Sequence, residues 1–178
     1  MHRQSLLDKL DGYAPFDQIE KRMVIAIDRF VQQNPDCFER TLDIGHITGS
    51  AWIVDLDRTH VLLTHHRKLD RWLQLGGHAD GDPDILRVAW REAAEESGLE
   101  NVRPVSQNIY DVDIHPIPAT AKEPAHFHYD VRFLFEADRN APLVMSSESK
   151  DLAWVPLERI AEYSGEESIL RMVYKMRR

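Results

Sequence analysis

The chain has 178 residues, of which 43% are hydrophobic and 29% charged, and its formal net charge is −8 at pH 7. This length and composition predict one globular domain with a sizeable core. The acidic balance argues against general nucleic-acid binding, which needs a basic surface. The single cysteine, Cys37, excludes an internal disulfide and fits a reducing compartment. The sequence contains neither a long apolar run nor a signal-peptide core, so we expect no membrane association and predict a cytoplasmic protein.

The N-terminal part contains two apolar patterns of helical spacing. Leu6 and Leu10 indicate a short amphipathic turn, and apolar residues between Pro15 and Asn34 recur at steps of three and four, which predicts a helix. We assign residues 1–40 to an N-terminal helical extension packed on the core. A homodimer interface is the other role that the sequence leaves open for it.

Two strands are expected next, from His46 to Leu56 and from Val61 to His66, joined by a polar turn. The basic cluster His65–Lys68 follows the second strand. Arg67 in this cluster could hold a phosphate group through its planar guanidinium. A solvated hairpin turn is the alternative interpretation.

The stretch from Leu75 to Leu99 is organised around a predicted helix, because its apolar residues recur at helical spacing. Asp82 is expected to cap the helix N-terminus, with Pro83 at the first helical position. Gly98 is a natural C-terminal stop.

Three acidic residues of this helix, Glu92, Glu95 and Glu96, are related by three- and four-residue steps and therefore project from one side. Their mutual repulsion would be relieved by Mg²⁺ or Mn²⁺, cations that prefer carboxylate oxygens. The alternative is a solvated acidic face with Arg91 as a local ion-pair partner.

At this point the stretch resembles the Nudix hydrolase family, whose pattern is G-x5-E-x7-R-E-U-x-E-E-x-G-U, where U is a bulky aliphatic residue. Counted from Gly77, the positions in register are Arg91, Glu92, Ala93, Glu95, Glu96, Gly98 and Leu99. Pro83 stands where the pattern has a glutamate, and Asp82 or Asp84 could partly substitute for it. The loop GGHADGD also resembles that of a bacterial Nudix subgroup.

The resemblance implies an α/β Nudix fold, a mixed sheet sandwiched between helices, for residues 41–178. It also implies hydrolysis of the diphosphate linkage in a nucleoside diphosphate joined to another group, such as a nucleotide sugar or ADP-ribose, with Mg²⁺ or Mn²⁺ as cofactor. The metal ligands expected from the resemblance are Gly76, through its carbonyl, Glu92, Glu95 and Glu96. The catalytic residues expected are Glu96, Glu148 and Arg91, where Glu148 or a helix glutamate deprotonates water and Arg91 orients a helix glutamate.

The resemblance also places substrate on the early strands, so His46, which shares a strand face with Thr48 and Ser50, is a candidate for the site wall. His78 in the glycine loop is a candidate to bind substrate or metal. For each of these residues, ordinary packing or an exposed loop position is the alternative.

A strand of near-ideal alternation begins at His126, and His126, His128 and Asp130 share one of its faces. We expect the two histidines to form part of the active-site wall. A second hypothesis makes all three residues ligands of a transition metal, which imidazole favours. A polar strand face without a ligand is the third.

The last third of the chain is expected to contain a loop from His115 to Pro124, a short strand near Trp154 and a final helix. Ser164 begins a capping-box pattern for that helix. The basic residues at its end, Arg171 and Lys175 among them, are explained by the negative helix terminus. The main alternative to an enzyme is a Nudix domain that binds a nucleotide-like ligand as a sensor, and Pro83 is its best support.

Overall fold

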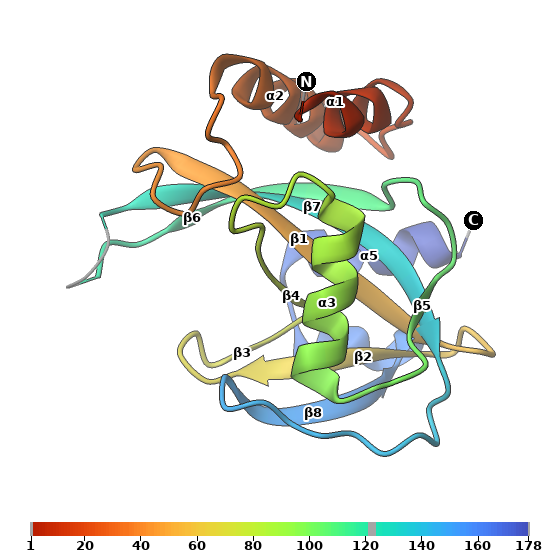
Figure 1. Ribbon diagram of the computed structural model, residues 1–178. Coiled ribbons are helices and arrows are strands. Elements are labelled where there is room, and N and C mark those ends of the chain that lie inside the picture. The colour runs from red at the N-terminus through yellow and green to blue at the C-terminus, as the bar shows by residue number, and fades with distance from the viewer. Residues whose placement is uncertain (1, 121–123, 178) are drawn as a thin grey trace.

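The structure, a computed structural model, describes residues 2–120 and 124–177. Along the chain its elements are α1 Gln4–Asp11, α2 Gln18–Gln33, β1 Gly45–Asp55, β2 His60–His66, β3 Arg71–Leu73, β4 Leu75–His78, α3 Ile85–Ser97, β5 Arg103–Pro104, β6 Asp111–Ile117, β7 His126–Ala137, β8 Ser149–Pro156, a 3₁₀ turn Leu157–Arg159, α4 Ile160–Tyr163 and α5 Glu167–Met176. In Figure 1, α1 and α2 lie together at the top, α3 crosses the front of the sheet and α5 lies behind it.

The eight strands form one mixed sheet in which β1 and β7 are the central parallel pair. The other pairings are antiparallel: β1 with β2 and β4, β2 with β3 and β8, and β7 with β5 and β6. The parallel register sets His46 opposite His128 and Thr48 opposite Asp130. Residues about eighty positions apart in sequence therefore lie side by side.

Alternation along β1 separates the interior into two apolar clusters. Ile47 and Ile53 belong to the cluster that contains residues of α1, α2 and α3, whereas Trp52 and Val54 belong to the cluster that contains residues of α4 and α5. Successive strand residues point to opposite faces, so one strand contributes to both clusters. The expected mixed sheet between helices is confirmed.

The N-terminal helices pack against the sheet. Ile27 and Val31 of α2 are fully buried in the cluster shared with α3. The ring of Phe30 stacks on Tyr129 of β7, with the ring centroids 3.8 Å apart. The helix α2 begins after Asp17, whose carboxylate accepts from the backbone N–H groups of residues 19 and 20. None of the helices among the described residues is long and apolar enough to span a membrane.

Arg171 of α5 is buried and Lys175 is partly buried, and carboxylates of other elements hold both side chains, so the negative helix terminus is not a sufficient explanation of these residues. Arg171 donates two hydrogen bonds of 2.8 Å to the carboxylate of Asp111 on β6. Lys175 donates to the same carboxylate at 2.6 Å and also contacts Glu20 of α2. Burial raises the pKa of Asp111, but its hydrogen bonds from Arg171 and the nearby cationic charges lower that pKa more. The network ties α2, β6 and α5 together.

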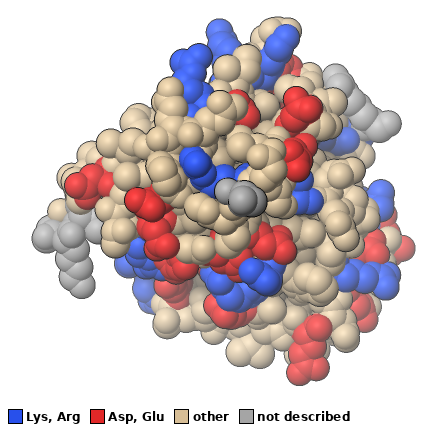
Figure 2. Space-filling model, turned by 45° about the horizontal axis from the view of Figure 1, so that its top comes forward, with Lys and Arg blue, Asp and Glu red and all other residues tan. Residues whose placement is uncertain are grey.

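Two further sequence predictions are corrected. The strand β6 continues to Ile117, so the segment from His115 to Pro124 does not start as a loop; residues 121–123 of that segment lie outside the described residues. Ser164 does not form the capping box, because α5 begins at Glu167 with Glu166 at the N-cap position and no side-chain capping hydrogen bond. Lys and Arg side chains are interspersed with Asp and Glu on the face in Figure 2.

Candidate metal-dependent hydrolase site

Gly76 and Gly77 lie within strand β4 and not in a loop as expected, and two glutamates of α3 lie directly against them. The backbone N–H of Gly76 donates to Oε2 of Glu96 over 3.2 Å. A Cβ atom on Gly77 would lie 2.5 Å from the carboxyl carbon of Glu92, which is closer than atoms can approach. Glycine is therefore required for the carboxylates to approach the strand backbone this closely.

The electrostatics of these glutamates favour a cation. Glu96 is only 8% exposed, and burial, together with the nearby charges of Glu92, Glu148 and Glu95, raises its pKa to about 8. Burial also raises the pKa of Glu92, an effect that Arg91 partly offsets. A divalent cation would neutralise this repulsion, and hard oxygen donors are what Mg²⁺ and Mn²⁺ prefer. The donor set thus fits the metal that the family pattern implies.

Arg91 connects helix α3 to strand β4. Its guanidinium donates to Oε1 of Glu92 at 2.8 Å and to the carbonyl of His78 at 3.0 Å. Both contacts restrict the position of the Glu92 carboxylate relative to β4.

Glu148 lies on the loop before β8, is exposed, and is close enough to Glu92 and Glu96 to raise the pKa of both. Arg67 at the end of β2 holds this loop. Its backbone N–H donates to the carbonyl of Glu148 at 2.8 Å, and its guanidinium donates to the carbonyls of Ser147 and Ser149 at 3.0 and 2.8 Å. The guanidinium fork of Arg67 is thus engaged with the loop that carries Glu148.

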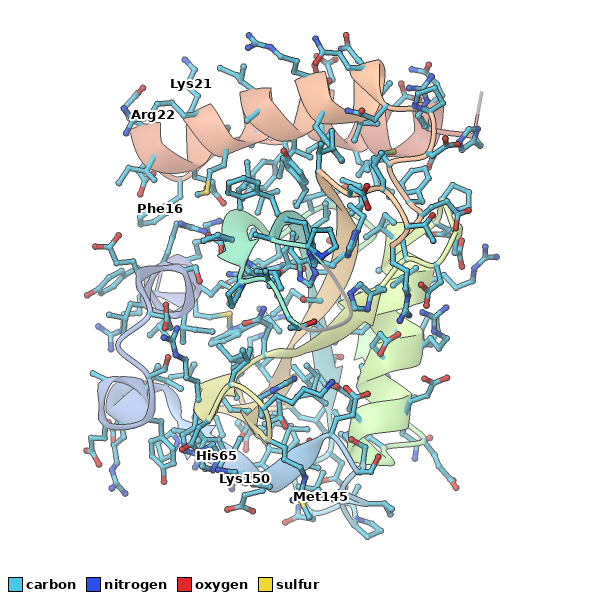
Figure 3. All side chains as sticks on the ribbon, turned by 90° about the vertical axis from the view of Figure 1, so that its left-hand side faces the viewer. Phe16, Lys21, Arg22, His65, Met145 and Lys150 are labelled. Atoms are coloured by element: carbon cyan, nitrogen blue, oxygen red, sulfur yellow. The ribbon has the colours of Figure 1, made fainter. Side chains whose placement is uncertain are left out.

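A second residue of the predicted basic cluster, His65, also lies beside β8. His65 and Lys150, from the adjacent strands β2 and β8, are close together in Figure 3, and both contact the carboxylate of Asp70, at 2.9 and 2.6 Å. Met145, at the bottom of the same view, belongs to the loop that leads to Glu148. These contacts fix the turn after β2 against the start of β8.

The prediction that Asp82 caps the N-terminus of α3 is wrong. The helix begins at Ile85 and its cap is Asp84, whose carboxylate accepts from the backbone N–H of Arg87. The Asp82 carboxylate is instead paired with the Arg87 guanidinium at 2.6 and 2.8 Å. Both aspartates flanking Pro83 are therefore occupied by local contacts, whereas the prediction of Gly98 as the stop is confirmed by its φ of 70°.

Asp130 is buried, and its carboxylate accepts hydrogen bonds from protein groups. The hypothesis of a metal held by His126, His128 and Asp130 together is therefore not supported. The Asp130 carboxylate accepts from Thr48 at 2.9 Å, Ser50 at 2.8 Å and Arg132 at 2.7 Å. These partners use the oxygen atoms that a metal would need.

The structure instead brings together histidines from four strands, β1, β4, β6 and β7. The ring centroids of His46, His78 and His128 lie 4.9 to 5.1 Å apart. His126 flanks His46 at 4.9 Å and His115 flanks His128 at 5.4 Å. His115 was not among the predicted site residues, although the alternation Asp-Val-Asp-Ile-His that leads into it indicates a strand that continues through this residue.

The NUDIX domain family profile matches residues 46–175, and no match to an individually curated protein was found by sequence. Among solved structures, the chain is similar to a C. elegans Ap4A hydrolase in a binary complex, with a TM-score of 0.60, 17% identity and coverage of 74% of this chain and 94% of that chain. It is also similar to the MutT protein of Methanosarcina mazei Go1, with a TM-score of 0.56, 18% identity and coverage of 76% and 95%.

A third similar structure is the E. coli dihydroneopterin triphosphate pyrophosphohydrolase, with a TM-score of 0.56, 14% identity and coverage of 72% and 92%. At such identities these similarities establish the shared fold. Together with the family match, they support the expected enzyme class, a Nudix-type pyrophosphohydrolase that acts on phosphorus-containing acid anhydrides. The family match covers most of the chain and includes the glycines of β4 and the glutamates of α3. The chain therefore belongs to the NUDIX domain family.

Proposed function

We propose that the protein hydrolyses the diphosphate linkage of a nucleoside diphosphate joined to another group, such as a nucleotide sugar, ADP-ribose or a related nucleotide, with Mg²⁺ or Mn²⁺. The observation that carries this proposal is the placement of Glu92 and Glu96 against the glycines of β4. Crowded, buried carboxylates are costly unless a cation is bound, so this arrangement favours metal binding over a solvated helix face.

In this mechanism Glu92, Glu95 and Glu96 hold the metal, together with the carbonyl of Gly76. When bound, the ion would neutralise charge on the diphosphate and lower the pKa of water. Arg91 orients Glu92, with which it shares a hydrogen bond. The proton of the attacking water passes to Glu148 or to Glu96. Reaction with water at phosphorus then yields two phosphate monoesters.

The substrate lies, in this proposal, against four histidines of the paired strands β1, β4 and β7: His46, His78, His126 and His128. Arg67 contributes by holding the Glu148 loop, and a direct phosphate contact by Arg67 stays a prediction. The names of similar structures, an Ap4A hydrolase and a dihydroneopterin triphosphate pyrophosphohydrolase, support a nucleotide-like substrate.

Phosphate-release assays on a panel of diphosphate compounds, each with Mg²⁺ and with Mn²⁺, test the proposal. The variant Glu96→Gln keeps the side-chain shape but removes the charge, and we expect it to lose at least 100-fold in kcat, on the order of the effect of removing a metal or general-base function. Glu100→Gln is the matched control, because Glu100 is exposed beyond the end of α3. Equal turnover by Glu96→Gln would refute the assigned site.

The second candidate function is a ligand-binding sensor without turnover. It is favoured by Pro83, where the family pattern has a glutamate, and by the engagement of Asp82 with Arg87, which leaves that carboxylate occupied. Saturable binding of a panel compound without product formation would support it. In that case Pro83→Glu is the variant that should restore turnover.

A cytoplasmic location and a homodimer through the N-terminal helices are proposed as well. The exposed side of α2 presents Ile19 and Ile25, each 50% exposed. Light scattering coupled to size exclusion, with Ile25→Lys as the variant, measures whether this surface joins two copies.

A further inference from the structure

A second group of potential metal ligands consists of histidines and includes none of the α3 carboxylates. His46 on β1, His78 on β4 and His128 on β7 each offer one ring nitrogen, and these three atoms lie within 4.8 Å of one another. The pairing of β1 with β4 and with β7 places all three on adjoining strands. The backbone of a sheet holds this arrangement, which is more rigid than a loop would be.

Within the described part of the chain, no hydrogen-bond partner accounts for the burial of the His46 ring. The side chain is 3% exposed, and neither of its ring nitrogens forms a hydrogen bond among the described residues. Nε2 of His128 is also buried without a partner in that part of the chain. Buried polar atoms are nearly always satisfied, and each one that is not costs free energy. These nitrogens therefore point to a ligand that binds between the strands.

We propose that His46, His78 and His128 form a binding site for a late first-row divalent cation, represented by Zn²⁺. Neutral imidazole is a good ligand for these ions and a poor one for Mg²⁺. Three protein ligands with an open fourth position are the arrangement of a zinc site that also accepts water or a substrate oxygen. The three histidines also belong to the proposed substrate wall, where the open position would face the substrate, but the metal site is inferred from their geometry and does not depend on the hydrolase function.

The distances allow such a site after a small contraction. A Zn–N bond of about 2.1 Å at tetrahedral angles places ligand nitrogens about 3.4 Å apart. The nitrogens, which lie within 4.8 Å, therefore approach one another by up to roughly 1.4 Å. His78 and His128 are only partly buried, so rotation of these rings is the expected movement and also leaves a route for the ion.

The neighbouring histidines are held by other groups. Nδ1 of His126 lies 2.9 Å from the carbonyl of Pro124, and Nδ1 of His115 lies 3.1 Å from a carboxylate oxygen of Asp113. These contacts restrict ring orientation around the site without contributing to the three-nitrogen group. His115 therefore provides a matched control for loss of a nearby imidazole.

His78 connects this site to the carboxylates. Its ring belongs to the histidine group, whereas its backbone carbonyl accepts from Arg91, which also donates to Glu92. The two sites use different donor atoms, nitrogen in one and oxygen in the other. They are therefore separable by the choice of cation and by mutation.

The test is calorimetric titration of chelator-treated full-length protein with Zn²⁺ in the presence of millimolar Mg²⁺, with visible absorption of Co²⁺ as a second readout. The variants are His46→Gln, His78→Gln and His128→Gln, with His115→Gln and Glu96→Gln as controls. Circular dichroism and urea titration establish that each variant is folded. If His46→Gln does not fold, the variants at the two partly exposed positions, His78→Gln and His128→Gln, provide the test.

We expect one Zn²⁺ per chain and a tetrahedral Co²⁺ spectrum, with affinity reduced at least about 100-fold in each of the three ligand variants, since even groups that only orient ligands contribute roughly 10- to 100-fold. His115→Gln and Glu96→Gln should bind as the wild type does. Absence of binding in the wild type, or binding that persists in folded His78→Gln and His128→Gln, overturns the proposal. Loss of Zn²⁺ binding in Glu96→Gln alone assigns the ion to the carboxylates and also overturns it.

Discussion

Replacing Glu96 by glutamine should stabilise the metal-free protein at alkaline pH. The carboxyl pKa is raised from its ordinary 4.5 to about 8, chiefly by burial and secondarily by neighbouring carboxylates. Because one pKa unit corresponds to about 1.4 kcal/mol, the full penalty for ionising this group in the folded state is on the order of 5 kcal/mol. Glutamine has a similar shape and carries no charge, so it avoids this penalty.

The direction of the pH dependence of stability follows from the raised pKa of Glu96 in the folded state. The contribution of Glu96 to stability is fully present below pH 4.5 and is lost as the pH rises through about 8. The free energy of unfolding of the wild type should therefore fall relative to that of Glu96→Gln by several kcal/mol between pH 4.5 and 8. Groups that titrate equally in both proteins cancel in this difference.

Urea denaturation in the presence of a chelator, followed by circular dichroism across this pH range, measures the difference. Glu100→Gln is the control, because Glu100 is exposed and lies beyond the end of α3. Saturating Mg²⁺ should then stabilise the wild type and leave Glu96→Gln nearly unchanged. A difference between wild type and Glu96→Gln that stays constant from pH 4.5 to 8 would refute the reasoning.

Three other substitutions test contacts that stabilise the fold or hold the loop of Glu148. Arg171→Met removes two hydrogen bonds to the fully buried Asp111 and should lower the free energy of unfolding by about 3–5 kcal/mol in urea titrations; a loss below about 1 kcal/mol would contradict this. Arg67→Ala releases the loop that carries Glu148, so steady-state kinetics should show kcat reduced roughly 10-fold with little change in KM, whereas a raised KM alone would indicate a phosphate contact. Gly98→Ala places a Cβ atom 2.5 Å from Val144 at a φ of +70° and should destabilise by more than about 1 kcal/mol in thermal denaturation; an unchanged Tm would show that the loop shifts freely.

Sequence patterns predicted much of the local structure around the site. The spacing of Glu92, Glu95 and Glu96 placed them on one side of a helix, and a glycine at position 98 marked its end, as the φ of 70° confirms. The alternation from His126 onward predicted a strand whose two faces differ. Helical and strand periods are local properties, so they can be read from neighbouring residues.

Helix starts and strand ends were harder to predict because several nearby residues could serve as caps. Asp82 and Asp84 are chemically equivalent candidates, and only the pairing of Asp82 with Arg87 decided which one caps α3. The burial of Arg171 could not be predicted from the local sequence either, because its partner Asp111 lies sixty residues away. A basic residue near a helix end is usually explained by solvent and the helix dipole, and tertiary packing overrode that expectation.

The sequence by itself thus determined the glutamate helix, the glycine pair that precedes it and the family to which they belong. Only the tertiary structure decided which distant groups share a site. The parallel register of β1 and β7 sets His46 beside His128, and the pairing of β1 with β4 adds His78. Strand pairing depends on the global topology and on burial of both sheet faces. No local pattern encodes it, so the histidine group emerged only when the sheet was assembled.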